Sequence, residues 1–102
     1  MDYPPVSPQV HTTSKLLESQ ATLVFWLVVN PKTVSTEATI ALHDGQNTSG
    51  TKRLEIATGY AFHPIFTPPI RFQHGLYVAI DTQVASYTVG YLTEEAIGKL
   101  EE

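Results

Sequence analysis

The side chains of this sequence that could do chemistry are four histidines and ten carboxylates. Zinc sites and metalloproteases place histidines at spacings such as HxH, HxxxH or HExxH, and no two histidines here have such a spacing. His43 is followed directly by Asp44, but catalytic triads are recognised by geometry rather than by adjacency, so a turn role is favoured for this pair. His74 stands directly before Gly75 in a predicted turn. Histidine adopts the left-handed backbone conformation more readily than most residues, so a turn role is favoured for His74 as well. The histidines are His11, His43, His63 and His74.

The carboxylates are dispersed as well, and nothing marks two of them as a facing pair of the kind that a glycosidase needs. The chain has no G-x-S-x-G sequence, no glycine-rich phosphate loop and no calcium-loop motif. Asp44 and Asn47 offer oxygen ligands, so a cation held by their loop stays an alternative. The sequence predicts a protein that is not an enzyme, with no catalytic residues, no cofactor and no metal.

Composition excludes further classes of function. Charged residues make up 16% of the chain, well below the roughly 25% of an ordinary soluble domain. The net charge is −4 and the six basic residues are scattered, so no basic stripe exists to neutralise phosphates, and we expect no nucleic-acid partner. Cysteine is absent, which removes disulfides and thiolate sites. The basic residues are Lys15, Lys32, Lys52, Arg53, Arg71 and Lys99.

No segment has the features of a membrane span or a secretory leader. The longest apolar run, Leu23 to Val29, is far shorter than the roughly 20 residues that cross a bilayer as a helix. The first ten residues carry prolines where a leader would carry an apolar core. We therefore expect no membrane partner.

Apolar and polar residues alternate with period two through most of the chain, which is typical of half-buried β-strands. The turn signals Asp44-Gly45, Thr58-Gly59, Pro68-Pro69 and His74-Gly75 separate the runs. Short strands every 8–12 residues or so predict an all-β fold, a single antiparallel β-sandwich or jelly roll of seven to eight strands. The expected strands are 9–17, 21–30, 36–43, 51–57, 61–67, 69–73, 76–82 and 85–92.

Both ends of the chain differ from this β-domain of residues 9–92. Residues 1–8 contain Pro4, Pro5 and Pro8, which favour an extended arm over an ordinary strand. This arm is predicted either to fray or to lie on a neighbouring subunit. Residues 93–102 are predicted to form a short acidic helical tail, with Thr93 as N-cap and Glu94 and Glu95 in the first turn.

The strand 21–30 is apolar on both of its expected faces. Leu23, Phe25, Leu27 and Val29 would point one way, and Val24, Trp26 and Val28 the other. A strand that is apolar on both faces must be covered by another part of the chain or by another molecule. The terminal segments and an oligomer interface are the two alternatives, and the interface is favoured because little chain is free to cover the strand.

A second contact region is expected in the stretch 68–80. Arg71 and Tyr77 would face outward on adjacent strands of a hairpin that turns at His74-Gly75, and an Arg–Tyr pair suits an interface. The predicted interface residues of the whole chain are Pro4, Pro5, Val24, Trp26, Val28, Arg71 and Tyr77.

Strand and turn residues of the sequence resemble those of small structural proteins of tailed bacteriophages. The segments ATIALHDGQNTSGTKRLEI, PPIRFQHGLYVAIDT and ASYTVGYL carry the resemblance, which covers about residues 36–92. The resemblance implies a β-sandwich virion component such as a capsid decoration or cement protein, a head spike or a tail-associated part. The matching residues are Leu42, Asp44, Gly45, Gly50, Thr51, Ile70, Phe72, Gly75, Leu76, Tyr77, Val78, Thr88, Val89 and Tyr91.

We therefore expect a non-enzymatic structural subunit of a virion, made in the host cytoplasm, with capsid decoration favoured over a tail or spike adaptor. Its expected partners are the major capsid protein or other virion proteins and copies of itself, with a trimer as the favoured homo-oligomer. The alternative is a glycan-binding β-sandwich that uses the outward rings of Tyr60 and Tyr77.

Overall fold

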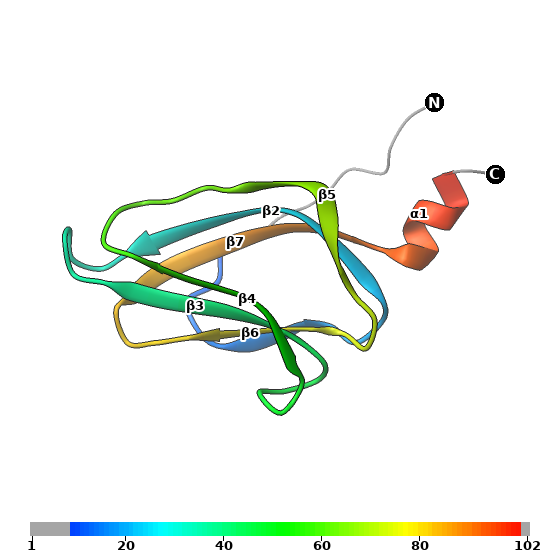
Figure 1. Cartoon of the computed structure of the whole chain (residues 1–102), viewed down its shortest axis with the longest axis horizontal. Coiled ribbons are helices and arrows are strands. Elements are labelled where there is room, and N and C mark those ends of the chain that lie inside the picture. Colours follow the sequence, from blue (N-terminus) through cyan, green and yellow to red (C-terminus); the bar gives the residue numbers. More distant parts are fainter. Residues whose placement is uncertain (1–8, 101–102) are drawn as a thin grey trace.

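Two antiparallel sheets face each other in the computed structural model, which describes residues 9–100 (Figure 1). One sheet has the strand order β1-β6-β3-β4 and the other has the order β5-β2-β7. The predicted all-β sandwich is confirmed. The elements are β1 (Lys15–Glu18), β2 (Thr22–Pro31), β3 (Ala38–Asp44), β4 (Thr51–Thr58), β5 (Ile65–Phe72), β6 (Leu76–Ile80), β7 (Val84–Thr93) and α1 (Glu94–Leu100).

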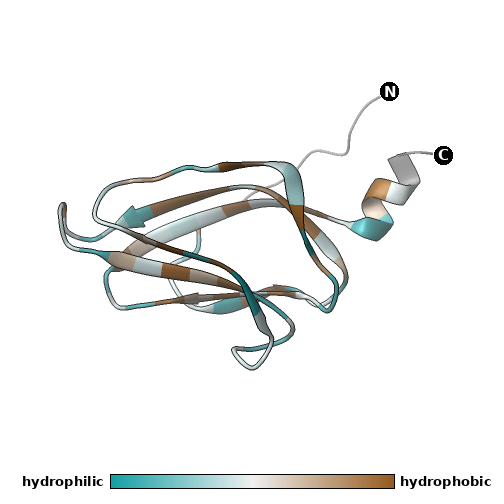
Figure 2. Ribbon diagram, in the orientation of Figure 1, coloured by the Kyte–Doolittle hydropathy of each residue, from teal (hydrophilic) through white to brown (hydrophobic). Residues whose placement is uncertain are grey.

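The alternating apolar residues fill the space between the two sheets. Figure 2 shows hydrophobic segments in strands of both sheets, and the inward side chains of these strands form one buried cluster. Such burial contributes about 25 cal/mol per Å² of apolar surface and is the main term that stabilises the fold. The cluster consists of Val24, Leu27, Val29, Ala38, Ile40, Leu42, Phe72, Leu76, Val78, Val84, Tyr87 and Val89.

A β-bulge in β2 changes which residues of this strand point inward. The register of β2 shifts between Val24 and Trp26 against both of its neighbours, β5 and β7. Val24 is buried before the bulge, and Leu27 and Val29 are buried after it. The prediction that Leu23 and Phe25 share a face with Leu27 is therefore wrong, because the extra residue of a bulge reverses the alternation beyond it.

Pro68 and Pro69 do not end a strand, contrary to the sequence prediction. Both lie inside β5, which replaces the two strands expected at 61–67 and 69–73. Among the described residues, β5 is an edge strand that pairs within its sheet with β2 alone. A proline has no N–H to donate, and no residue between Ile65 and Ile70 has a register partner on β2, so neither proline interrupts a regular ladder.

The stretch 68–80 is not a hairpin. β5 belongs to the three-stranded sheet, whereas β6 pairs with β1 and β3 in the other sheet. The turn at His74-Gly75 therefore carries the chain from one sheet to the other. Arg71 and Tyr77 lie in different sheets, so the expected Arg–Tyr pair on adjacent strands is wrong.

The expected first strand, 9–17, is split between the two sheets. His11 and Tyr87 exchange two backbone hydrogen bonds of 2.9 Å at the edge of β7, and the chain then crosses to β1. The Tyr87 hydroxyl donates to the carbonyl oxygen of Thr13 at 2.7 Å, which fastens this crossing segment. Burial, with a smaller contribution from Tyr77, raises the pKa of Tyr87 to about 12. The hydroxyl therefore stays protonated and keeps donating far above neutral pH.

The helix α1 follows β7 directly, and its N-cap is the predicted one. The backbone N–H of Ala96 donates to Oγ1 of Thr93 at 3.1 Å, which satisfies one of the free donors of the first turn. Figure 1 shows α1 beyond the end of the sandwich rather than over either sheet. This helix therefore leaves the outer face of β2 uncovered.

No helix in the described part of the chain is both long and apolar enough to cross a membrane.

Candidate interaction face on the three-stranded sheet

The outer face of the β5-β2-β7 sheet is built around Trp26. This side chain lies on the outward side of β2, and its register partner on β7 is Gly90. The indole ring rests directly on Gly90, so a Cβ atom at that position would collide with the ring. Gly90 is itself buried in consequence. An aromatic ring laid over a glycine on the neighbouring strand is a known way to close a gap in a sheet surface.

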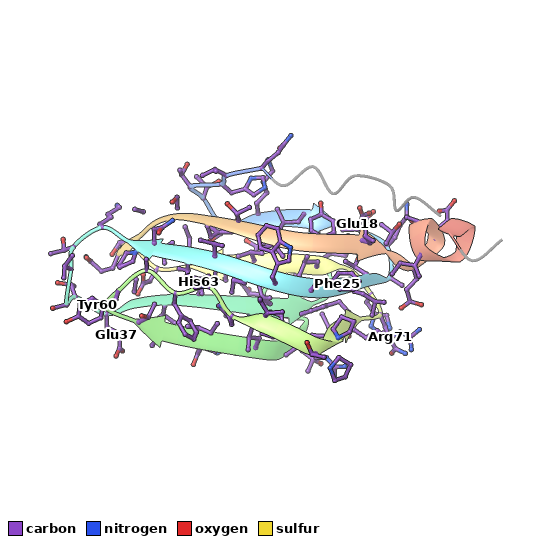
Figure 3. The ribbon with its side chains drawn as sticks, turned by 90° about the horizontal axis from the view of Figure 1, so that it is seen from above. Glu18, Phe25, Glu37, Tyr60, His63 and Arg71 are labelled. Atoms are coloured by element: carbon purple, nitrogen blue, oxygen red, sulfur yellow. The ribbon has the colours of Figure 1, made fainter. Side chains whose placement is uncertain are left out.

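An apolar groove runs beside Trp26, between β2 and the start of β5. Its volume is about 390 Å³. Figure 3 looks onto this side of the molecule and labels Phe25 and His63, two of the residues that form it. Ile65 is the register partner of Trp26 on β5, and it is 78% exposed. The full lining is Phe25, Trp26, Leu27, Val28, His63, Ile65, Phe66 and Thr67.

Further exposed apolar side chains lie along the segment that leads into β5. Phe62 is 45% exposed, and it is held beside β2 by two backbone hydrogen bonds with Val29, of 2.9 and 3.0 Å. Leu27 also donates its N–H to the carbonyl oxygen of Pro64 at 3.1 Å. The apolar surface is therefore held by the backbone of β2. An apolar patch of this kind, with polar His63 and Thr67 beside it, is typical of a binding surface.

The structure brings together only part of the predicted interface. Trp26 and Val28 both line the groove, but Val24 is fully buried in the core and cannot contact a partner. The reason is the bulge, which places Val24 and Trp26 on opposite sides of the sheet. Pro4 and Pro5 lie outside the described residues.

Arg71 and Tyr77 occupy different surroundings. Arg71 is at the helix end of β5, where its Nε donates to Oε2 of Glu94 at 2.6 Å. The hydrogen bond and the charge of Glu94 raise the pKa of Arg71, although the ion pair is exposed and so adds little stability. Tyr77 is half-buried in the other sheet, with its ring edge-on to His43 and the centroids 6.4 Å apart.

Sequence reasoning missed Ile65 and Phe62. The segment 61–67 looked like an ordinary half-buried strand, with one face in the core. A usable signal was present, because Phe62, Ile65 and Phe66 include both odd and even positions and cannot all face inward in one regular strand. The same argument had singled out β2, and the two segments lie side by side.

The polar residues at one end of the sandwich hold loops together. Asp44 Oδ1 accepts a hydrogen bond of 2.7 Å from the backbone N–H of His74, and the Asp44 side chain is only 9% exposed. Gln46 Nε2 donates to the carbonyl oxygens of Ser19 (3.2 Å) and His74 (2.7 Å). The ring of His43 is bonded elsewhere, with Nδ1 3.1 Å from the carbonyl oxygen of Gly50. His43 and Asp44 therefore do not act as a pair.

Burial alone would raise the pKa of Asp44. The backbone N–H groups of His74 and Gln73 and the positive charges of His74 and Arg53 outweigh that effect, so the pKa of Asp44 lies below its usual value. The side-chain oxygen of Asn47 accepts from the backbone N–H of Ser49 at 2.9 Å. Within residues 9–100 no three His, Asp or Glu side chains are grouped so that they could hold a metal ion.

Replacing Asp44 by asparagine is expected to lower the free energy of unfolding by about 1–2 kcal/mol at pH 7, because the charged acceptor of the backbone N–H of His74 is lost. The folded pKa lies below the unfolded value of about 3.9, so this contribution is present above that value and is lost as pH falls through the folded pKa. Urea unfolding of both proteins at pH 7 and pH 3 measures it, with the exposed-carboxylate variant Glu37→Gln as control. An equal loss at both pH values would contradict the assignment.

Comparison of the chain with protein-family models, with curated proteins and with solved structures found no match. The class of protein is therefore defined by its own fold and surface. It is an all-β two-sheet sandwich. Its particular feature is an apolar, partly aromatic groove open on the outer face of the three-stranded sheet.

Proposed function

We propose that this protein is a non-enzymatic structural subunit that assembles through the outer face of its β5-β2-β7 sheet. The observation that carries the proposal is the groove of Phe25, Trp26, Val28 and Ile65. Protein–protein interfaces bury aromatic and aliphatic side chains in this way, inside a polar rim. An isolated β-sandwich has no structural need to expose Ile65 in the middle of such a surface.

The proposed setting is the virion of a tailed bacteriophage, with capsid decoration as the favoured role. The resemblance of the strand and turn residues between about 36 and 92 supports it, and so does the low proportion of charged residues, 16%. Copies of the same chain and neighbouring virion proteins are the proposed partners. A subunit repeated by symmetry needs one face that is complementary to its neighbour, and the groove provides such a face.

The glycan-binding alternative has no comparable support. Tyr77 is the register partner of His43, near the end of β3. Tyr60 lies near the start of β3, where its hydroxyl forms a hydrogen bond of 3.0 Å with the hydroxyl of Ser35. The two rings therefore form no common platform. The polar side chains that line the groove are His63 and Thr67, fewer than the convergent set that would orient a sugar.

Self-association of the purified protein tests the proposal, measured as mass against concentration by light scattering or sedimentation. Ile65→Asp is expected to weaken association at least tenfold, because a carboxylate would have to lose its water at the contact. Val34→Asp is the matched control, since Val34 is 71% exposed but lies outside the groove. A protein that stays monomeric at its highest soluble concentration, or equal effects of the two variants, would contradict assembly through this face.

A further inference from the structure

We infer that the groove binds the proline-rich segment of residues 1–8 from a second copy of the chain. The inference rests on the proposed assembly and names the part of the partner that fills the groove. The segment reads MDYPPVSP and contains Pro5-Val6-Ser7-Pro8, a PxxP sequence, directly after Pro4. Such sequences bind aromatic-lined grooves, since their extended backbone loses little conformational entropy on binding.

The groove has the chemistry that a PxxP segment needs. Trp26 and Phe25 supply aromatic surface, and Ile65 on β5 is the register partner of Trp26. His63 and Thr67 lie at the same groove and offer polar groups to the carbonyl oxygens of an extended peptide. Proline rings have no N–H to satisfy, so they can enter an apolar groove without leaving a donor unpaired.

The path of the chain ahead of β1 indicates that the segment comes from another copy. His11 and Tyr87 form an antiparallel pair, so at His11 the backbone runs along the free edge of β7. The groove lies on the other side of β7, between β2 and β5. The described chain therefore begins at the free edge of β7, with β7 and β2 between it and β5 on the far side of the groove.

The segment is long enough to reach a neighbour. Eight residues in an extended polyproline conformation span up to about 25 Å, at roughly 3.1 Å per residue. The inference therefore requires the groove of the second copy to lie within about 25 Å of this edge. The other terminal element described, α1, extends from the end of the sandwich (Figure 1), and none of its residues lines the groove.

The test uses the full-length chain and its single tryptophan, Trp26, as reporter. The double variant Pro5→Ala/Pro8→Ala is expected to weaken self-association at least tenfold and to shift the emission of Trp26 to longer wavelength. A synthetic peptide of residues 1–10, added in excess to the wild-type chain, is expected to dissociate the assembly while keeping the emission of Trp26 blue-shifted. The same peptide with alanine at positions 5 and 8 is expected to do neither.

The outcomes separate this inference from the proposed function. If Ile65→Asp abolishes association but the proline variant and the peptide have no effect, the face is an interface and the arm is not its occupant. If association is lost in the proline variant but the peptide fails to dissociate the wild-type assembly, or dissociates it with a shift of the Trp26 emission to longer wavelength, the arm binds elsewhere and the inference is overturned. A wild-type chain that is monomeric, with Trp26 exposed only in the proline variant, would show that the arm covers its own groove and would overturn both.

Discussion

Replacing Gly75 by alanine is expected to lower the free energy of unfolding by about 3 kcal/mol. Gly75 has φ = 129°, a backbone conformation that residues with a Cβ rarely adopt. A Cβ there would also lie 2.8 Å from the carbonyl oxygen of Gly45 and 2.9 Å from that of Glu18. Both atoms belong to the backbone and cannot move aside cheaply. Conformational strain and crowding therefore act together.

The position matters because three segments meet there. The N–H of Gly45 donates to the carbonyl oxygen of Gly75 at 3.2 Å, which joins the β3–β4 loop to the turn that changes sheets. The side-chain amide of Gln46 also donates hydrogen bonds to the backbone carbonyl oxygens of Ser19 and His74. An alanine at position 75 pushes these segments apart at one point, so we expect the loss to appear in global unfolding rather than as local loosening.

Urea unfolding followed by Trp26 fluorescence, at one fixed protein concentration, measures the change. Gly98→Ala is the matched control, because a Cβ at Gly98 in α1 would meet nothing within 4 Å beyond its chain neighbours and the backbone of its own helix. Alanine is the better helix former by up to about 1 kcal/mol, so this variant is expected to be neutral or stabilising. A Gly75→Ala protein as stable as Gly98→Ala would show that the turn can relax without cost.

Local sequence patterns predict the parts of this fold that local chemistry decides. Alternation places Ile40 and Leu42 of β3, and Leu76 and Val78 of β6, in the core, and the structure buries all four. Asp44-Gly45 predicts the loop between β3 and β4, and Thr93 predicts the start of α1. Each of these predictions depends on residues within a few positions of each other in the chain.

The wrong predictions all depend on which strand lies beside which. The bulge in β2 is defined by its register with β5 and β7, and an isolated segment 21–30 gives no sign of it. Pro68 and Pro69 are tolerated because they lie in an irregular part of edge strand β5 that has no register partner on β2, a property of the assembled sheet. The turn at His74-Gly75 joins two sheets because β5 and β6 pair with different strands, which the local sequence does not show. Strand order is set by contacts between residues far apart in sequence, which alternation does not encode.

The candidate interaction face was predictable to the same extent. The apolar outer positions Trp26 and Val28 could be identified from the strand itself, and both line the groove. The sequence alone places Val24 on the same face as Trp26 and Val28, and only the bulge shows that Val24 points into the core. Ile65 joins the site only because β5 lies against β2, with Ile65 as the register partner of Trp26. The groove is a product of that pairing and has no contiguous sequence signature.

Replacing Gly90 by alanine is expected to lower the free energy of unfolding by about 2 kcal/mol. The new Cβ would collide with the indole ring of Trp26, so the ring must leave the surface of β7. The backbone itself accepts alanine, because Gly90 has no positive φ. The emission of Trp26 should shift to longer wavelength, and self-association should weaken with it because the ring forms part of the groove.

The same substitution is expected to change sign when Trp26 is already alanine. Without the ring there is no collision, and alanine is favoured over glycine within a strand by about 0.5–1 kcal/mol. Gly90→Ala should therefore stabilise the Trp26→Ala protein, and circular dichroism in urea measures it without the fluorophore. The coupling between the two positions would then exceed about 2 kcal/mol, the range expected for residues in direct contact. An equal loss of stability in the wild-type and Trp26→Ala proteins would mean that the indole ring does not lie on Gly90. Trp26 would then occupy a different position, and the groove would have a different lining.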